Sequence, residues 1–366
     1  MSPREEGLCV LVGNRSDSPR GPAAGKVRGN STNEEVISMP DLASFQRAQL
    51  ELSEVLNPTP MQYSRTFSNY TGHRVWVKPE SLQKTGSFKI RGAFTKMARM
   101  GAEDRKLGVI TGSSGNHGAA VAFAADRLGV PCTVVMPVDA PELKRNAVAA
   151  YGGEILLHGR FSNERKERAK ELAEERGLTY VDSTDDEDII AGQGTCSVEI
   201  MEEMPDVDVI MAPIGGGGLM SGVSCAAKLM RPAVEIIGVE PHGSNSMSAS
   251  LAAGKPVTVE IDTIADGLRT PKPGPVTFDY CSRFVDRIHL VSEEEIEDAT
   301  VLAAERLKLM IEPSGAVSLA GLLAGAVKGR DKKVAVILTG GNADLRTMAA
   351  LFEAGLKTFP GDAMHP

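Results

Sequence analysis

Aromatic residues and positive charge are both scarce in this sequence. Phe, Trp and Tyr make up 4% of its 366 residues, and Trp occurs once. The 40 Lys and Arg residues are outnumbered by 48 Asp and Glu residues, so the formal net charge at pH 7 is −8. Proteins that bind nucleic acids or anionic membranes use basic surfaces, and single-strand binders add aromatic platforms. We therefore expect neither kind of partner.

Long apolar runs and paired cysteines are also lacking. The longest uncharged apolar stretch, Gly315 to Val327, is shorter than the about 20 residues that span a bilayer. The cysteines are odd in number and form no Cys-x-x-Cys pair, so no disulfide framework is expected. They are Cys9, Cys132, Cys196, Cys225 and Cys281. We expect a protein without a membrane span, in a reducing compartment, the cytoplasm.

Length and composition predict a globular chain of about two domains. Hydrophobic residues make up 42% and charged residues 24%, which is ordinary for globular proteins and excludes disorder throughout. Residues 1–38 differ, because they are rich in Gly, Ser, Pro, Asn and Arg, and we predict a disordered tail there. A transit peptide is the alternative. Glu5, Glu6 and Asp17 count against it, since such peptides are poor in acidic residues.

Short apolar runs alternate with helical patterns after this segment. A helix with Asp41 as its N-cap is expected first, ending near Asn57. A later helix begins with a capping box at Ser292 and Glu295. The predicted strands are Val75–Lys78, Gly108–Thr111, Cys132–Pro137, Glu154–His158, Thr179–Asp182, Val207–Ile214, Glu235–Val239, Arg287–Val291 and Val334–Thr339. Alternation of this kind predicts the α/β class, with parallel sheets covered by helices on both faces.

Four consecutive glycines, Gly215 to Gly218, follow one predicted strand and precede a helical run. Their backbone N–H groups can converge on an anion, to which the helix N-terminus adds positive potential. The segment lacks the Gly-Lys-Ser/Thr ending of a nucleotide-binding P-loop. Spacing alone predicts either a phosphate site or a tight strand–helix turn.

A second polar loop, Ser113-Ser114-Gly115-Asn116-His117, also joins a predicted strand to a helix. Its small residues expose backbone N–H groups, and its side chains offer two hydroxyls, an amide and an imidazole. Such a loop suits a carboxylate ligand. The alternative is a capped helix start with no ligand.

A lysine stands in a third loop, between Phe88 and Ile90. Most lysines are solvated surface charges. Lys89, however, lies against apolar neighbours and close to Arg91, and both features lower the pKa of an amine. A neutral amine can form a Schiff base.

These motifs together resemble those of fold-type II pyridoxal-phosphate enzymes. The segment Lys78 to Ala93 is similar to the cofactor-lysine motif of that family, and the two loops follow in the family's order. So does Thr339-Gly340-Gly341-Asn342 near the C-terminus. The threonine/serine dehydratase branch, which includes serine racemase, is the most similar, and the resemblance spans about Asp41 to Leu345.

The resemblance implies roles for the matching positions. Lys89 would bind pyridoxal 5'-phosphate covalently and later act as the base at the substrate Cα. Ser114 would match the acid/base on the opposite face in racemases. The other implied cofactor contacts are Phe88, Asn116, Gly215, Gly216, Gly217, Gly218, Leu219, Thr339 and, at the cofactor edge, Gly267. The implied substrate-carboxylate site consists of Ser113, Ser114, Gly115, Asn116 and His117.

Thr339 matches a Ser that faces the pyridine nitrogen in the family. A hydroxyl does not keep the pyridine nitrogen protonated as an aspartate does, so the ring is a weaker electron sink and rapid loss of a β-leaving group is favoured. Metal-binding members carry a Glu followed by an Asp six residues later. Glu240 matches the first position, but Ser246 replaces the second. Two interpretations of Glu240 therefore stay open: it binds a divalent cation, or it is a carboxylate that is only solvated or hydrogen-bonded.

The resemblance implies two α/β domains with the cofactor in the cleft between them. The predicted large domain comprises residues 39–100 and 180–366, and the small domain residues 101–179. The expected reaction is β-elimination from L-threonine, and also from L-serine, to a 2-oxo acid and ammonia, in a homodimer or homotetramer. The alternatives are a serine racemase, a 3-hydroxyaspartate ammonia-lyase and a catalytically silent protein that binds the cofactor.

Overall fold

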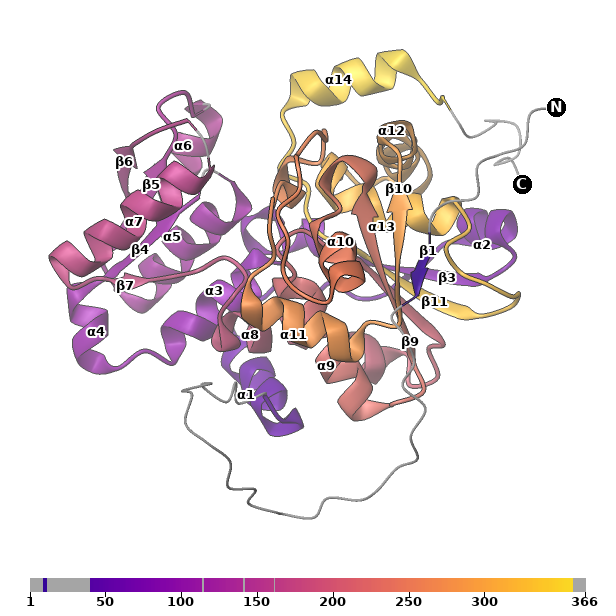
Figure 1. The fold of residues 1–366 in the computed structure, drawn as a ribbon, viewed down its shortest axis with the longest axis horizontal. Helices are drawn as coiled ribbons and strands as arrows, with labels where there is room; N and C mark the ends of the chain where they lie inside the picture. Colours follow the sequence, from indigo (N-terminus) through magenta and orange to yellow (C-terminus); the bar gives the residue numbers. More distant parts are fainter. Residues whose placement is uncertain (1–8, 12–39, 114, 141, 161, 358–366) are drawn as a thin grey trace.

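Two separate sheets organise the chain in the computed structural model, which describes residues 9–11, 40–113, 115–140, 142–160 and 162–357 (Figure 1). One sheet has seven strands and the other has four. The order in the larger sheet is β1 (Cys9–Leu11), β10 (Arg287–Val291), β9 (Glu235–Pro241), β8 (Val209–Pro213), β11 (Lys333–Leu338), β3 (Arg74–Pro79) and β2 (Gln62–Tyr63). The order in the smaller sheet is β6 (Glu154–Leu157), β5 (Cys132–Met136), β4 (Val109–Gly112) and β7 (Thr179–Tyr180).

All nine predicted strands are present, and they pair in parallel with one another. The predicted α/β architecture is thus confirmed. The antiparallel edge strands β1 and β2 were missed, because two or three residues give no periodicity to read. Within the predicted disordered tail, residues 9–11 form β1 and pair with β10, and the extent of that tail stays a prediction. The rest of that segment, residues 1–8 and 12–38, lies outside the described residues.

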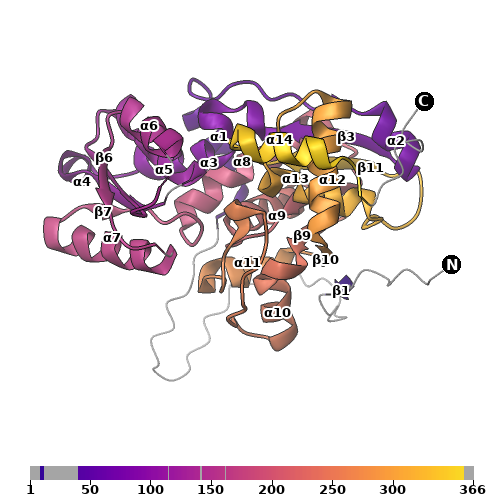
Figure 2. The ribbon, with the colours of Figure 1, turned by 90° about the horizontal axis from the view of Figure 1, so that it is seen from above.

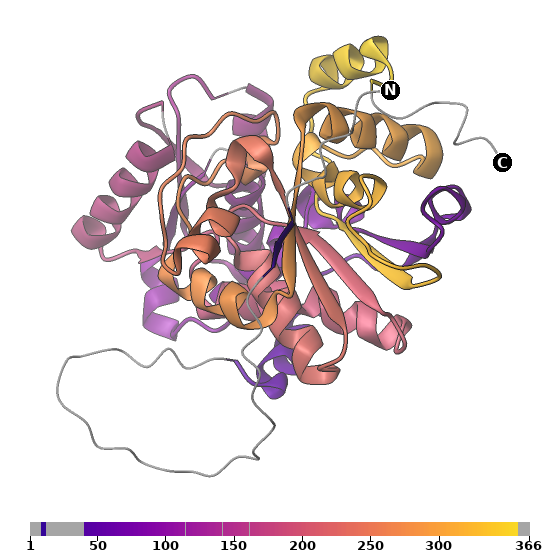
Figure 3. The same ribbon diagram turned by 45° about the vertical axis from the view of Figure 1, so that its right-hand side comes forward.

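Alternating residues of the central strands face two different helical layers. Val209 and Met211 of β8 pack with α12 (Glu293–Leu302) and α13 (Pro313–Leu323). Ile210 and Ala212 pack with α8 (Glu187–Glu203) and α9 (Gly218–Met230). Because side chains alternate along a strand, each strand contributes to both cores. Figure 3 shows α14 (Leu345–Ala354), in yellow, lying outside the first of these layers.

The smaller sheet lies to one side with its own helices, as Figure 2 shows. These are α4 (Ala102–Leu107), α5 (Asn116–Leu128), α6 (Glu142–Ala150) and α7 (Ser162–Arg176). Its core also takes in Leu52 of α1 (Leu42–Leu52) and Ile90 of α3 (Lys89–Ala98). Two helices from residues 39–100 thus help to cover the smaller sheet. The domain division at residues 101 and 179 stays a prediction.

Several helix boundaries follow the predicted capping signals. The Asp41 side chain accepts a hydrogen bond from Ser44 N at the start of α1. Ser292 and Glu295 form the predicted capping box at the start of α12. The remaining helices are α2 (Arg65–Thr71), α10 (Ser246–Ala253) and α11 (Pro275–Phe284). Among the described residues, no helix combines the length and apolar character needed to cross a membrane.

Candidate active site

The predicted loops all leave the carboxyl ends of parallel strands. The segment with Lys89 follows β3, the loop from Ser113 to His117 follows β4, and the tetraglycine loop follows β8. Thr339 directly follows β11. In open α/β sheets this edge is where ligands bind, and hydrogen bonds described below join these loops across the two sheets.

Lys89 is the first residue of α3, and backbone contacts fix its position. Phe88 N donates to Thr339 O at 3.1 Å, and Ser87 forms a β-bridge with Gly340. Lys89 Nζ donates to Ser183 O at 2.9 Å and lies 5.1 Å from the centre of the Phe88 ring. Backbone hydrogen bonds therefore hold the Lys89 segment beside the C-terminal motif.

The Lys89 amine is partly uncharged near neutral pH. Desolvation and the positive charge of Lys166 lower its pKa to about 8, against the opposing attraction of Asp182. The Lys89 side chain is only half-buried, so solvent still reaches part of it. A neutral amine within reach of solvent is the form that attacks an aldehyde to make a Schiff base.

Asn116 connects three of the predicted motifs through its amide. Its Nδ2 donates to Glu312 Oε1 at 2.6 Å, and its Oδ1 accepts from Asn342 Nδ2 at 2.8 Å. Asn342 Nδ2 also donates to Thr85 O, beside the Lys89 loop, at 2.7 Å. One N–H of the Asn116 amide remains for a ligand, and both ends of that amide are held in place.

Glu312 is a buried carboxyl at the start of α13. Desolvation and the nearby negative charge of Asp266 raise its pKa to about 7, although the hydrogen bond from Asn116 acts in the opposite direction. The resemblance to the family also matches Glu312-Pro313-Ser314-Gly315 to a segment that borders the site, where Glu312 would approach the cofactor or cap the following helix. It did not show that this carboxyl holds Asn116.

His117 is buried and neutral. Its Nε2 lies 3.2 Å from Val181 O, and because a carbonyl only accepts, Nε2 carries the proton. Desolvation and the charge of Lys89 lower the pKa of the ring to about 3. Its Nδ1 is buried without a hydrogen-bond partner among the described residues, so an acceptor is available there.

The rest of this loop is short and polar. Ser113 Oγ accepts from Gly115 N at 3.4 Å, just before α5 begins at Asn116. Ser114 lies outside the described residues, so its predicted role as acid/base stays a prediction.

The tetraglycine loop lies so close to neighbouring segments that it leaves no space for side chains. Gly217 has a φ of 91° and serves as the N-cap of α9 without any side-chain cap. A Cβ at Gly216 would fall 2.8 Å from Thr184 Cγ2, and one at Gly217 would fall 2.8 Å from Thr277 Cβ. Leu219, in the first turn of α9, is buried. Unblocked N–H groups at a helix N-terminus suit a phosphate.

Gly267 lies beside this loop, and its N–H is already in use. It donates to Ser314 Oγ at 2.8 Å. A Cβ at Gly215 would come 3.0 Å from Leu268 Cα, so the segment around Gly267 packs against the glycine loop. Gly267 thus lies near the predicted cofactor edge, and a direct contact stays a prediction.

Glu240 takes part in a different arrangement. Its two carboxylate oxygens accept from Met247 N at 2.9 Å and Ser248 N at 2.8 Å, at the start of α10. Desolvation raises its pKa to about 7. No group of three or more His, Cys, Asp and Glu side chains suited to a metal occurs within the described part of the chain. The structure shows the hydrogen-bonded alternative, and a cation at Glu240 stays an untested prediction.

The segment after β7 is the part of the site that the sequence did not single out. Asp182 Oδ1 accepts from Thr184 N and Asp185 N, which shapes a turn. That turn presents Ser183 O to Lys89 and Thr184 to the glycine loop. This segment could have been found from its polar residues directly after a predicted strand, because the other three loops were found by that signal.

A family comparison accounts for this arrangement. Residues 52–340 match the model of the family described as pyridoxal-phosphate dependent enzyme. The chain belongs to this family. The predicted family, fold class and cofactor are confirmed. The roles of the individual site residues stay predictions.

Relatives of this pyridoxal-phosphate enzyme fall into several activities. L-threonine ammonia-lyase of Thermotoga maritima is 43% identical over 86% of this chain and 79% of its own length. Serine racemase of Schizosaccharomyces pombe is 38% identical over 86% of this chain and 97% of its own. The processed form of threonine deaminase isoform 2 from Solanum lycopersicum superposes with a TM-score of 0.82 at 33% identity, covering 89% of this chain and 99% of that chain.

The residues of this enzyme fit pyridoxal phosphate. Lys89 offers a desolvated amine, and the tetraglycine loop leads into α9 without any side-chain cap on the helix N-terminus. Three buried polar atoms close to the predicted site lack a partner among the described residues, namely Thr85 Oγ1, Ser87 Oγ and His117 Nδ1. Buried polar groups in folded proteins are normally hydrogen-bonded, so these atoms are suited to a bound ligand or water.

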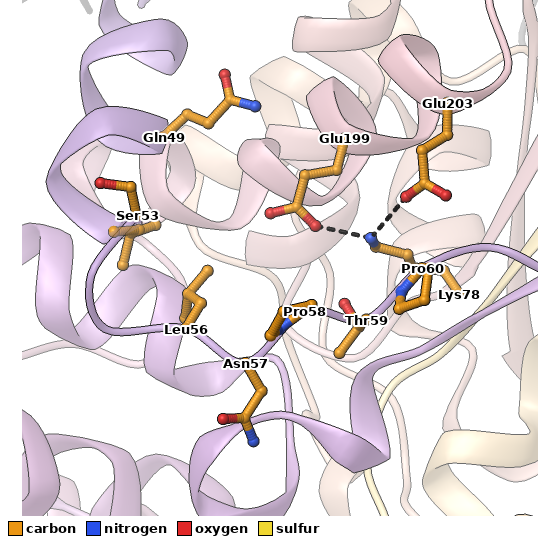
Figure 4. Close-up of a pocket in the computed structure, with 11 residues that line it drawn as sticks. Gln49, Ser53, Leu56, Asn57, Pro58, Thr59, Pro60, Lys78, Glu199 and Glu203 are labelled. Carbon is orange, nitrogen blue, oxygen red and sulfur yellow. Dashed lines mark ion pairs between the residues drawn. The ribbon is translucent and has the colours of Figure 1, made fainter.

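A cavity of about 340 Å³ lies elsewhere, between α1, α8 and residues 56–60 (Figure 4). In it Lys78 Nζ lies 2.7 Å from Glu199 Oε2 and 3.7 Å from Glu203 Oε1. Lys89, Asn116 and the glycine loop do not line it. This cavity is therefore separate from the predicted cofactor site.

Proposed function

We propose that this enzyme is an ammonia-lyase that converts L-threonine, and also L-serine, to a 2-oxo acid and ammonia. The observation that carries the proposal is the position of the Lys89 amine, 2.9 Å from Ser183 O and 5.1 Å from the centre of the Phe88 ring, where desolvation lowers its pKa to about 8. Two L-threonine ammonia-lyases with 43% and 44% identity support this assignment over the racemases compared, which are 38% and 39% identical.

Different residues of the chain bind the substrate and transfer its protons. The cofactor, when bound, supplies the electron sink that makes the substrate Cα–H acidic. The N–H groups of the loop from Ser113 to His117 hold the substrate carboxylate. Lys89 Nζ takes the Cα proton and returns it to the β-hydroxyl, which leaves as water. Tautomerisation and hydrolysis of the remaining enamine then give the 2-oxo acid and ammonia.

A direct assay separates the candidate activities. Purified enzyme with pyridoxal phosphate is offered L-threonine, L-serine and L-threo-3-hydroxyaspartate, and 2-oxo acid release is measured beside the chirality of the recovered amino acid. We expect 2-oxobutyrate from L-threonine at the highest kcat/KM. Release only from hydroxyaspartate, or D-serine without 2-oxo acid, would replace the proposal with the corresponding alternative. If the protein binds the cofactor but turns over none of these substrates, the alternative that remains is a catalytically silent protein that binds the cofactor.

We also propose that the enzyme is a homodimer or homotetramer. Leu82, Met310 and Leu345 are large apolar side chains with exposures of 48%, 45% and 73%. Two of them belong to neighbouring segments, since Ser81, next to Leu82, and Met310 both lie against Gly341. A second copy that covers these side chains would remove apolar surface from water. Sedimentation equilibrium at a monomer mass would contradict the proposal.

The cytoplasm is our proposed location. Cys132, Cys196, Cys225 and Cys281 are free and buried thiols, which suits a reducing compartment. Fractionation of cells that express the tagged full chain tests this location, and enzyme found only in an organelle fraction would contradict it.

A further inference from the structure

The cavity between α1, α8 and residues 56–60 has a charged side and an apolar side (Figure 4). Glu199 and Glu203 lie on one face of α8, because residues four apart in a helix share a face, and both point toward Lys78. The apolar lining consists of Leu52, Leu56, Pro58 and Pro60. A volume of about 340 Å³ lies within the range of small-molecule sites, which combine apolar walls with a few polar groups.

The positive charge of Lys78 is not available to a ligand. Its side chain is 1% exposed, and its Nζ lies 2.7 Å from Glu199 Oε2. The Glu199 carboxylate also accepts from both terminal nitrogens of Arg91, at 2.6 Å and 2.8 Å. Lys78 and Glu199 are thus paired within the protein, and the lining offers no free positive charge that would bind an anion.

Glu203 supplies the charge that the cavity presents. Its side chain is 39% exposed, and its Oε2 accepts from Met61 N at 2.9 Å. Its Oε1 lies 3.7 Å from Lys78 Nζ, which is longer than a hydrogen bond, and no other described residue donates to it. The connected ion-pair network consists of Lys78, Arg91, Glu80, Glu199 and Glu203. Two cations and three carboxylates leave one negative charge uncompensated, at the oxygen that faces the cavity.

The uncharged polar side chains of the lining already donate to protein acceptors. Their bonds are Ser53 Oγ to Leu50 O at 2.8 Å, Gln49 Nε2 to Glu202 Oε2 at 2.7 Å and Asn57 Nδ2 to Leu82 O at 3.0 Å. The cavity therefore offers a ligand a carboxylate oxygen and apolar surface. This combination fits a cation with a hydrocarbon chain better than a free amino acid, whose carboxylate needs hydrogen-bond donors.

We propose that this cavity is a second ligand site of the enzyme, which binds a small alkylammonium ion. The N–H group of the ion donates to Glu203 Oε1, and its alkyl chain packs against Leu52, Leu56 and Pro58. A charge-assisted hydrogen bond and the removal of apolar surface from water both favour this complex. The site shares no residue with the predicted cofactor site, so the proposal does not depend on the role of Lys89.

The test uses N,N-dimethylbutylamine as the probe and the full-length holoenzyme. This amine is protonated at neutral pH, and as a tertiary amine it forms no Schiff base with the cofactor. Saturation-transfer NMR and calorimetric titration should both show saturable binding. The neutral alcohol 1-hexanol has a chain of similar length and should bind at least about tenfold more weakly, because it lacks the charge.

Two variants locate the site, and a third is the control. Glu203→Gln keeps an oxygen for Met61 N and removes the charge, so the Kd of the amine should rise at least about tenfold. Ser53→Phe places a large side chain at an exposed position of the lining and should block both probes, which also serves if Glu203→Gln does not fold. Glu54→Gln removes the same charge from an exposed neighbour outside the lining and should leave the Kd unchanged.

The outcomes are distinct. Binding that is weakened in Glu203→Gln, blocked in Ser53→Phe and normal in Glu54→Gln supports the proposal. Absence of saturable binding, equal affinity for 1-hexanol, or equal weakening in Glu203→Gln and Glu54→Gln would overturn it. Displacement of the amine by an equal concentration of potassium ions would mean a site for inorganic cations and would also overturn it. The release of 2-oxo acid is measured separately, so failure of the proposed function would leave this result standing.

Discussion

Replacement of Glu312 by Gln should stabilise the enzyme at alkaline pH. The folded-state pKa of this carboxyl is raised to about 7 from 4.5, chiefly by desolvation and next by Asp266. A raised carboxyl pKa means that its stabilising contribution is fully present below the unfolded pKa and is lost as pH rises through the folded one. The difference of about 2.5 units corresponds to about 3 kcal/mol of unfolding free energy.

The Gln variant keeps an oxygen that can accept from Asn116 Nδ2, and it carries no charge to bury. Thermal unfolding of wild type and Glu312→Gln, measured from pH 4 to 8, should give equal Tm values at the acid end and a higher Tm for the variant at pH 8. Exposed Glu260 provides the control, because Glu260→Gln makes the same substitution at a surface carboxyl instead of a buried one. A variant that is less stable than wild type at pH 8 would refute the reasoning.

Three further perturbations test other parts of the structure. Gly216→Ala puts a Cβ 2.8 Å from Thr184 Cγ2. The Kd for pyridoxal phosphate, measured by fluorescence titration, should therefore rise at least about tenfold, which corresponds to about 1.4 kcal/mol of binding free energy. An unchanged Kd would contradict a phosphate site at this loop. Arg91→Met removes the partner of Glu80, and both side chains are fully buried. This change should cost about 3–5 kcal/mol in urea unfolding, and a loss below about 1 kcal/mol would mean that the pair is dispensable. The His117 ring, whose pKa is lowered to about 3 by desolvation and by Lys89, should show no NMR titration between pH 5 and 8; titration near its usual value would contradict the buried neutral ring.

The sequence was informative where function depends on local segments. Three loops after apolar strands were found because Gly, Ser and Asn next to a strand end have few other structural reasons to occur together, and the motif from Thr339 to Asn342 was found through the family resemblance. Each of these loops lies where the alternation predicted, at the carboxyl end of a parallel strand. The same local signals placed the caps of α1 and α12.

Contacts between distant segments could not be read in this way. Asn116 and Glu312 are 196 residues apart, and Lys89 and Ser183 are 94 apart. The sequence named Glu312 as a border residue, but its link to Asn116 depends on how two sheets meet.

The covalent attachment of the cofactor tests the central claim most directly. Holoenzyme reduced with borohydride, digested and analysed by mass spectrometry should carry the pyridoxyl phosphate mass on the peptide that contains Lys89, and Lys89→Ala should lose both this mass and 2-oxo acid release. Attachment at another lysine, or turnover retained in Lys89→Ala, would contradict the account.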